Sequence, residues 1–417
     1  MSDPVATAPG TDTVFMSTNP DYDVIIAGGG PAGTSAAIHL ALRGARVLLA
    51  EQKKFPRPKL CGEFISPECI TQFELLGVSE QMLASSPSPL TETVFYSQAG
   101  ARVSVPSDWF SKGGVALGLS RAEMDERLLR RAAEVGVDVR EETSVTSLNF
   151  ENDRVAGVNL KTHNTEESVS APITIDATGR ARVLARMAEK SGSVRSRQRE
   201  LVAFKAHLRN TGVAHGACEI YFYRGGYGGL SSIENGLSNL CFIVNARDVR
   251  RCQSNAGRVL REIVCRNQRA SLTLRDAVPD SDWLAVSLEG FGLHSPTPVD
   301  GLLTIGDAAS FIDPFTGGGM LMALESGELV ANTIMRRLSQ LNEPQLQMLS
   351  EQYRAAYARQ FNTRLRLCSL IRRAAFAPGV ADFAIRLFGA SDSLRRRVAR
   401  ATRSQPKRNF SSAQQFK

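Results

Sequence analysis

The segment Gly28–Gly33, with the sequence GGGPAG, constrains the fold of this chain more than any other feature. The apolar run Val24–Ala27 precedes it, and an alanine- and leucine-rich stretch reaches from Pro31 to about Arg43. A second apolar run, Ala45–Glu51, follows and ends in an acid. This succession predicts a strand, a glycine turn, a helix and a second strand. Such a unit is typical of a parallel sheet.

The glycines fit the pattern G-x-G-x-x-G, in which each position has a physical task. Gly28 permits a tight turn, Gly30 lets the backbone approach a pyrophosphate, and Gly33 lets the helix pack closely on the strand. Pro31 and Ala32 begin the helix, whose unpaired N–H groups and positive dipole end attract phosphate. The segment therefore predicts a dinucleotide site.

Glu51 supports this interpretation because it ends the second strand, eighteen residues after Gly33. A carboxylate at this place accepts hydrogen bonds from ribose hydroxyls and disfavours a 2′-phosphate. NAD and FAD therefore remain as candidate cofactors. The alternative, a purely structural glycine turn, gives Glu51 no role.

A second glycine-rich segment, GDAASFIDPFTGGG at 306–319, follows the buried run LLTI. Asp307 is expected at the end of that strand, where it is suited to ribityl or phosphate-linking oxygens. Gly317, Gly318 and Gly319 expose N–H groups at the start of a predicted helix that runs to Leu338. A cofactor with a second, longer arm needs a second contact surface, so the two segments together favour FAD.

The remaining patterns predict further domains. Ser120 is suited to be the N-cap of a helix, and residues 146–179 alternate as strands and turns before DATG. Alternating residues at 195–288 predict an antiparallel sheet that a helix near 255–269 interrupts, and the chain is mainly helical from Pro344. We expect an α/β protein with a Rossmann-type FAD-binding domain, an antiparallel-sheet substrate domain and a C-terminal helical segment. The expected boundaries are 1–20 for a disordered lead, 21–95, 120–190 and 289–340 for the FAD-binding domain, 96–119 and 191–288 for the substrate domain, and 341–417 for C-terminal helices with a basic tail.

These motifs, with KLCGEFISPE at 59–68 and SRAEMDERL at 120–128, resemble FAD-dependent oxidoreductases of the aromatic-hydroxylase fold, most closely the geranylgeranyl-reductase-like branch. The resemblance implies that FAD lies along Arg121, near Asp176 and Gly179, and that Asp307 holds its ribityl chain or pyrophosphate. It implies that the loop from Pro314 to Gly319 lines the isoalloxazine ring. It also implies NAD(P)H as the electron donor, taken up without a separate Rossmann domain, since the chain has one complete G-x-G-x-x-G.

Three further residues are candidates for contact with the cofactor or the substrate. In the branch that the chain resembles, a cysteine at the position of Cys61 lies near the flavin, which implies a redox or substrate-gating thiol. Packing as a small apolar side chain is an equal alternative for Cys61. Tyr223 and Tyr227 are candidates for lining a substrate pocket, although aromatic residues on strands more often pack in a core.

The reaction type stays open at this point. Reductases of the branch carry Tyr, Trp and Pro in a substrate-domain strand, where this chain has Tyr227, Gly228 and Ser232, and the W-x-W-x-I-P signature of flavin halogenases is absent. The wide membership of the fold favours a monooxygenase that hydroxylates a hydrophobic or phenolic small molecule of secondary metabolism with NAD(P)H and O₂. The alternatives are a flavin-dependent C=C reductase of the geranylgeranyl-reductase type and a non-enzymatic flavin-binding sensor.

The charge and cysteine content of the chain indicate which partners, location and metals to expect. The formal net charge is +8, and much of the excess lies in the last fifty residues. That stretch lacks a nucleic-acid-binding signature, so we expect no nucleic acid. A solvated helix face and a weak association with an anionic membrane surface are the two alternatives for it. The first twenty residues carry no Lys or Arg and no run spans a bilayer, which favours a cytoplasmic location, with a peripheral membrane position as the alternative. Seven cysteines and five histidines show no metal-ligand spacing, so no metal is expected.

Overall fold

The computed structural model describes residues 20–111, 113–189, 201–288, 291–313, 317–338, 343–376 and 380–401. The expected disordered lead, apart from Pro20, and the tail after Ala401 lie outside these ranges. Within them, no helix combines the length and the hydrophobicity that crossing a membrane requires.

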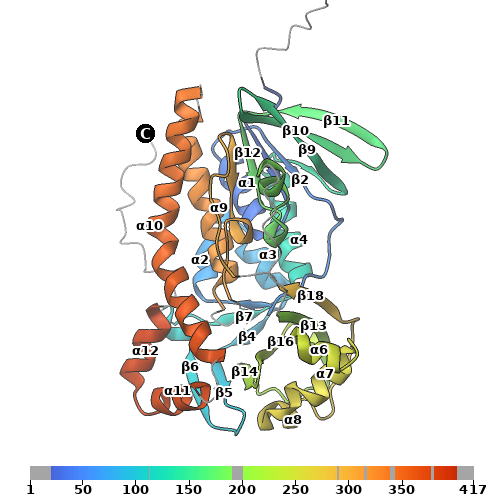
Figure 1. Ribbon diagram of the computed structural model, residues 1–417, viewed down its shortest axis with the longest axis vertical. Helices are drawn as coiled ribbons and strands as arrows, with labels where there is room; N and C mark the ends of the chain where they lie inside the picture. Colours follow the sequence, from blue (N-terminus) through green and yellow to red (C-terminus); the bar gives the residue numbers. More distant parts are fainter. Residues whose placement is uncertain are drawn as a thin grey trace, which may run out of the picture.

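A five-stranded parallel sheet forms the centre of the upper half of the molecule (Figure 1). The register pairs Ala27 with both Ala50 and Asp176, so three strands end at one edge of the sheet. The expected strand–helix–strand unit is confirmed, and the chain returns to this sheet after the second domain, as predicted. The strand order is β20 (Leu302–Thr304), β12 (Ile173–Asp176), β1 (Val24–Ala27), β2 (Val47–Ala50) and β8 (Asp138–Arg140).

Both faces of the parallel sheet are covered, which explains why its strands are apolar at every position. Val24 and Ile26 pack with the helices, whereas Ile25 and Leu48 pack with the three-stranded meander. The helices on the first face are α1 (Pro31–Ala41), α2 (Glu68–Leu76), α4 (Arg121–Glu134) and α9 (Gly319–Met335), and the meander on the second is β9 (Thr143–Glu151), β10 (Arg154–Thr162) and β11 (Thr165–Ser170). Helices α3 (Ser79–Ala84) and α5 (Val183–Ala188) lie beside these elements.

An eight-stranded, largely antiparallel sheet forms the lower half (Figure 1). The expected boundary between the FAD-binding and substrate domains lies at 95/96. In the structure β5 pairs with β14, so this sheet includes residues from Glu92 onward. Its strands are β17 (Val278–Pro279), β13 (Leu201–Arg209), β16 (Ser238–Asn245), β15 (Gly226–Ser232), β14 (Ala217–Tyr223), β5 (Glu92–Tyr96) and β6 (Arg102–Pro106), with β18 (Leu284–Leu288) on β13. A small sheet of β3 (Phe64–Ile65), β7 (Ala116–Gly118) and β4 (Ser88–Leu90) lies between the two halves.

One helix expected within the second domain is broken into shorter pieces. A helix is present within the predicted range 255–269 but fills only part of it: the segment forms α7 (Ala256–Glu262), a 3-10 turn and α8 (Gln268–Thr273), after α6 (Ala246–Arg251). Asn267 causes the break because it is fully buried and caps α8 by accepting a hydrogen bond from the Ala270 N–H. Its amide donates to the carbonyls of Tyr96, Ser97 and Phe222, which ties the turn to the sheet.

The C-terminal part is helical, as predicted. Helix α10 (Glu343–Phe376) runs along both halves of the molecule, and α11 (Val380–Gly389) and α12 (Asp392–Ala401) pack against the eight-stranded sheet at β6 (Figure 1). A short ladder of β19 (Gly292–Leu293) and β21 (Ser310–Phe311) borders the second glycine-rich segment. The predicted fold class, a Rossmann-type domain with a second sheet and C-terminal helices, is confirmed.

Candidate cofactor site

The first glycine segment forms a tight loop between β1 and α1. Gly28 adopts a φ of +108°, and a Cβ there would lie 2.4 Å from the Ala177 carbonyl oxygen. A Cβ on Gly33 would lie 1.9 Å from the Gly28 carbonyl oxygen, so helix and loop approach too closely for any side chain. Gly30 precedes α1 and supplies no side-chain cap. Pro31 has no N–H, so the N–H groups of the first turn from Ala32 onward face a ligand position uncapped.

Glu51 fastens this loop to the end of β2. Its buried carboxylate accepts the Gly29 N–H at 2.9 Å and the Lys53 N–H at 2.9 Å, and Arg57 Nη2 lies 3.2 Å from Oε2. A carboxylate has about four acceptor positions, so it retains capacity for a ribose hydroxyl. The structure thus places Glu51 beside the first loop and gives it a structural task that sequence reasoning did not foresee.

Helix α4 brings a fixed cation to the same loop. Ser120 is its N-cap, as predicted, since Ser120 Oγ accepts the Glu123 N–H. The buried Arg121 guanidinium forms two hydrogen bonds to Asp125, at 2.7 and 2.6 Å. Burial alone lowers the pKa of Arg121, but the Asp125 carboxylate outweighs it and raises the pKa above its usual range. Arg121 Nη2 lies 4.0 Å from the point where a Cβ on Gly30 would be.

The second glycine segment meets the first in space. Gly306 has a φ of +57°, and a Cβ there would lie 2.8 Å from the Ala32 Cβ at the start of α1. The next residue, Asp307, is half-buried, and within the described residues its carboxylate has no hydrogen-bond partner. Burial raises the pKa of Asp307, and nearby Lys59, Arg180 and Arg121 oppose this shift. The two remote glycine segments are therefore neighbours, with an available carboxylate at their junction.

The residues after β12 complete this edge of the sheet. The buried Asp176 accepts the N–H groups of Thr178 and Ala185, both at 2.9 Å, and so fixes the turn that carries Gly179. Gly179 has a φ of +72°, and Lys59 Nζ lies 3.8 Å from the position of a Cβ there. Asp176 thus shapes the edge of the site through the backbone, while Gly179 leaves room for the lysine.

Lys59 and Arg180 belong to the site although they were not predicted site residues. Burial lowers the pKa of Lys59, and the positive charges of Arg121 and Arg57 lower it further. The Arg180 guanidinium lies 5.3 Å from the centre of the Phe311 ring. Cations that repel one another in a half-buried place are suited to hold an anion such as a pyrophosphate. Only their spatial proximity, and no spacing in the sequence, reveals this cluster.

The second segment continues toward α9. Gly317 has a φ of +62°, the Gly318 carbonyl accepts a hydrogen bond from Arg364, and Gly319 begins α9. Pro314 lies outside the described residues. The predicted site residues of this segment therefore lie between Asp307 and the start of α9, and Arg364 of α10 is an addition that sequence reasoning missed.

Cys61 lies where the two halves of the molecule meet. Its thiol is half-buried and interacts with the Arg121 guanidinium, and its Sγ accepts the Glu63 N–H at 3.4 Å. Asn239 of β16 donates to the Cys61 carbonyl at 3.1 Å. Cys241 lies two residues after Asn239 on β16, and burial raises the pKa of its thiol to about 12. Cys241 is thus held as a neutral thiol, whereas Cys61 sits beside a cation.

A buried charge network joins the Cys61 loop to the eight-stranded sheet, and sequence reasoning missed it. The fully buried Glu63 carboxylate forms an ion pair with Lys205 of β13, is hydrogen-bonded to His207 Nε2 of the same strand at 2.7 Å, and accepts the Arg121 N–H at 2.8 Å. Lys205 Nζ also donates to the Lys59 carbonyl. Burial raises the pKa of Glu63, but His207 and Lys205 outweigh it and lower the pKa below its usual range.

The two candidate pocket tyrosines lie on opposite faces of the eight-stranded sheet. Tyr223 packs with the cluster under α6–α8 and donates to the Ile243 carbonyl, so it belongs to a core. Tyr227 lies on the other face, pairs with Phe222 and donates to Asp313. Six aromatic residues belong to the cluster on this face, and we call them the aromatic wall: Phe95, Phe222, Tyr227, Phe291, Phe311 and Phe388. Leu60 also contacts this cluster, so the wall borders the Cys61 loop.

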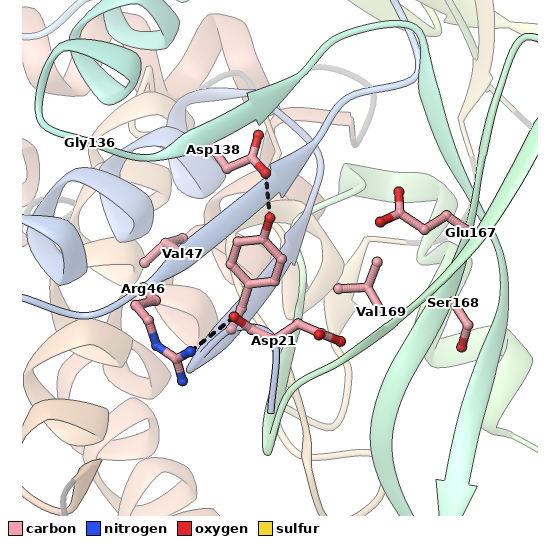
Figure 2. A pocket seen from close by; sticks show the side chains of 9 residues that line it. Asp21, Arg46, Val47, Gly136, Asp138, Glu167, Ser168 and Val169 are labelled. Atoms are coloured by element: carbon pink, nitrogen blue, oxygen red, sulfur yellow. Dashed lines mark hydrogen bonds between the residues drawn. The ribbon is translucent and has the colours of Figure 1, made fainter. Parts of the chain in front are cut away.

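A separate open hollow of about 510 Å³ lies elsewhere (Figure 2). Asp21, Arg46, Asp138 and Glu167 are among the residues that line it, at the amino ends of the parallel strands. The acids there are engaged, for example Asp21 with Ser170 and Glu167 with Arg140. Ligands of open α/β sheets bind at the carboxyl ends instead. The hollow is therefore not part of the site built by the glycine segments.

This geometry fits FAD. The glycine loop presents uncapped N–H groups, Glu51 lies beside it at the end of β2, and Gly306, next to Asp307, meets the start of α1. A comparison with protein families decides the matter, because residues 21–362 match the family model described as "FAD binding domain". The chain belongs to this family. It is an FAD-dependent oxidoreductase near the geranylgeranyl-reductase-like branch.

Relatives of this FAD-dependent oxidoreductase match over most of its length. The digeranylgeranylglycerophospholipid reductase of Methanosarcina mazei is 27% identical over 326 residues, which cover 76% of each chain. Among solved structures, a flavin-dependent brominase superposes with a TM-score of 0.77 at 20% identity, covering 91% of this chain and 93% of the brominase. A geranylgeranyl bacteriochlorophyll reductase-like protein from Thermoplasma acidophilum gives 0.74 at 20% identity, covering 89% and 92%. The structural matches establish the shared fold.

Proposed function

We propose that this oxidoreductase reduces carbon–carbon double bonds of a hydrophobic, isoprenoid-like substrate with NAD(P)H as electron donor. The aromatic wall is the observation that supports a hydrophobic substrate. It contacts the Cys61 loop at Leu60 and includes Phe311 of the second glycine segment. The reductase name of the Methanosarcina mazei relative supports the reaction type. A monooxygenase, which the wide membership of the fold favours, is the second candidate.

Different residues of the chain would bind the two halves of FAD and the substrate. The first glycine loop, Glu51 and Arg121 would hold the nucleotide half of FAD, and Asp307 and Gly317–Gly319 the other half. Bound and reduced, FAD supplies a hydride equivalent for carbon. The aromatic wall would orient the apolar substrate and exclude water. The reaction balances as one C=C bond, one NAD(P)H and one proton giving the saturated bond and NAD(P)⁺.

An anaerobic assay tests the reaction type. The holoprotein is incubated with NADPH or NADH and a digeranylgeranylglycerophospholipid in detergent, with oxygen removed. We expect products that gain two hydrogen atoms for each double bond reduced, seen by mass spectrometry. A protein that leaves this lipid and geranylgeranyl substrates unchanged, yet incorporates label from ¹⁸O₂ into a hydrophobic compound, would overturn the proposal.

The second candidate is hydroxylation of a hydrophobic or phenolic compound. One feature favours it. Gly228 stands where reductases of the branch carry a tryptophan, and a larger residue does not fit there because its Cβ would lie 2.9 Å from the Phe242 Cβ. The balance is substrate C–H, O₂, NAD(P)H and a proton giving C–OH, water and NAD(P)⁺. A non-enzymatic flavin sensor would be distinguished by a yellow colour that NAD(P)H does not bleach.

Cys61 is our candidate for the thiol that acts at the site. Replacing it by serine is expected to lower kcat by about a hundredfold, the usual contribution of a positioned proton donor. The affinity for FAD should stay within about threefold, because the phosphate loop is untouched. Steady-state kinetics and FAD titration measure both. Cys241→Ser is the matched control, and equal effects of the two variants would show that Cys61 merely packs.

We also propose that α11 and α12 attach the protein weakly to an anionic membrane surface. Phe383 and Leu387, one turn apart on α11, are 66% and 45% exposed, and Arg396 and Arg397 of α12 are exposed as well. Arg395, by contrast, is engaged with Asp392 and lies over the Trp109 ring. The exposed set combines apolar and cationic side chains, as interfacial helices do.

Replacing Phe383 and Leu387 by serine is expected to weaken binding to vesicles of anionic phospholipid by at least about tenfold, given the usual value of burying one large apolar side chain. Replacing Arg396 and Arg397 by glutamine should abolish the preference for anionic over neutral vesicles. Leu272→Ser, on exposed α8, is the control. Sedimentation with vesicles measures the bound fraction. Unchanged binding by both double variants would remove the membrane proposal.

A further inference from the structure

Helix α10 lies alongside the chain segment that carries the second glycine segment (Figure 1). Contacts recur along the helix. Ser350 Oγ donates to Asp300 at 3.2 Å, Tyr353 OH donates to the Thr304 carbonyl at 2.9 Å, and the hydroxyls of Tyr357 and Ser310 are hydrogen-bonded. The helix therefore follows β20 and β21 from before Asp307 to the loop beyond it.

Arg364 continues this series at the far end of the loop. Its side chain is 4% exposed, its Nη2 donates to the Gly318 carbonyl at 2.9 Å, and its Nη1 lies 3.5 Å from Glu325 of α9. A Cβ on Gly318 would lie 2.3 Å from Arg364 Nη2. Gly318 is thus a glycine because the arginine occupies the space that a side chain would need.

Arg372 stands about two helical turns farther along α10, at the near end of the same loop. Its Nε lies 3.8 Å from Asp313 Oδ2, and its guanidinium lies 4.8 Å from the centre of the Phe291 ring. Asp313 also accepts the Tyr227 hydroxyl. Helix α10 therefore contacts both Asp313 and Gly318. These two residues flank the loop that is predicted to line the isoalloxazine ring.

We propose that Arg364 and Arg372 are positioning residues for the isoalloxazine half of FAD. Their contacts given above are to the second segment, whereas the first glycine loop is fixed by Glu51. The arginines hold the ends of the second segment in place, and the nucleotide half of FAD is bound independently. Loss of an arginine therefore weakens contacts to the ring half alone. The inference rests on FAD binding and is independent of whether the reaction is reduction or hydroxylation.

The experiment compares the affinities of apoprotein for FAD and for ADP, the fragment that lacks the flavin. Arg364→Gln and Arg372→Gln are expected to weaken FAD binding by at least about tenfold and to leave ADP binding unchanged, since each removes a charge-assisted contact to the loop. The visible spectrum of bound flavin should shift, because the surroundings of the ring change. Arg364→Lys should restore FAD binding in part, and Gly318→Ala should resemble Arg364→Gln.

Arg366→Ala, at an exposed position on the same helix, is the control and should behave as the wild type. The proposal is overturned if the glutamine variants bind FAD with wild-type affinity and spectrum. It is equally overturned if folded variants lose FAD and ADP to the same extent. Should Arg364→Gln fail to fold, Arg372→Gln and Arg364→Lys decide between these outcomes. Failure of the reductase assay alone would leave this comparison unaffected.

Discussion

Replacing Gly33 by alanine is expected to yield a colourless protein. The added Cβ would lie 1.9 Å from the Gly28 carbonyl oxygen, so the loop that faces the pyrophosphate must move. Overpacking of this kind costs roughly 3 kcal/mol, and we expect the affinity for FAD to fall by at least about a hundredfold. The visible absorbance of the purified protein and a fluorescence titration of apoprotein with FAD measure the effect.

Gly257→Ala is the matched control for this substitution. Gly257 lies in α7, far along the chain from the loop, and the nearest atoms to an added Cβ are 3.5 Å away. Alanine should leave the colour unchanged and stabilise the helix by up to about 1 kcal/mol. If Gly33→Ala were as yellow as the wild type and bound FAD equally well, the first loop would not be the phosphate site.

Replacing Glu63 by glutamine is expected to lower the free energy of unfolding by about 3 kcal/mol, a value typical of breaking a buried ion pair. Lys205 is almost fully buried and would be left without its carboxylate partner. Urea unfolding monitored by fluorescence measures the loss. Adding Lys205→Met should recover part of it, since both charges are then absent. Glu262→Gln, which breaks the exposed pair with Arg258, is the control and should cause a much smaller loss.

The same network predicts how stability depends on pH. Since the pKa of Glu63 is lowered in the folded protein, its contribution is present above the ordinary carboxyl pKa and is lost as the pH falls through the lowered value. The wild type should therefore lose more stability on acidification than Glu63→Gln does. Unfolding curves recorded over a series of acidic pH values test this. Parallel losses in the two proteins would contradict the assigned role of Glu63.

Features of the first loop could be predicted from the sequence because they depend on local spacing. Gly33 packs on Gly28, the Ser120 cap binds Glu123, and Glu51 binds the loop that follows the adjacent strand. The meeting of the two glycine segments followed from a chemical argument, the length of the cofactor. Their contact through Gly306 and Ala32 agrees with it.

Other features depend on pairings that no local pattern specifies. Lys205 and His207 reach Glu63 because β13 directs alternate residues toward the Cys61 loop, and nothing in the sequence of that strand identifies its partner. Tyr223 and Tyr227 looked equivalent, yet the register that pairs Tyr227 with Phe222 puts them on opposite faces. A shift of one residue in the register between β14 and β15 would have put both tyrosines on the same face.

The course of α10 along both halves of the molecule also bears on biosynthesis. The residues proposed to hold the nucleotide half of the coenzyme are translated before residue 310, whereas Arg364 and Arg372, which contact the second segment, are translated later. A nascent chain that still lacks these arginines already contains the first glycine loop and Glu51. It does not yet contain the two residues proposed to position the segment near the flavin ring. Acquisition of the coenzyme would accordingly proceed in two stages, with the adenine end captured first and the redox-active end seated when synthesis is nearly complete.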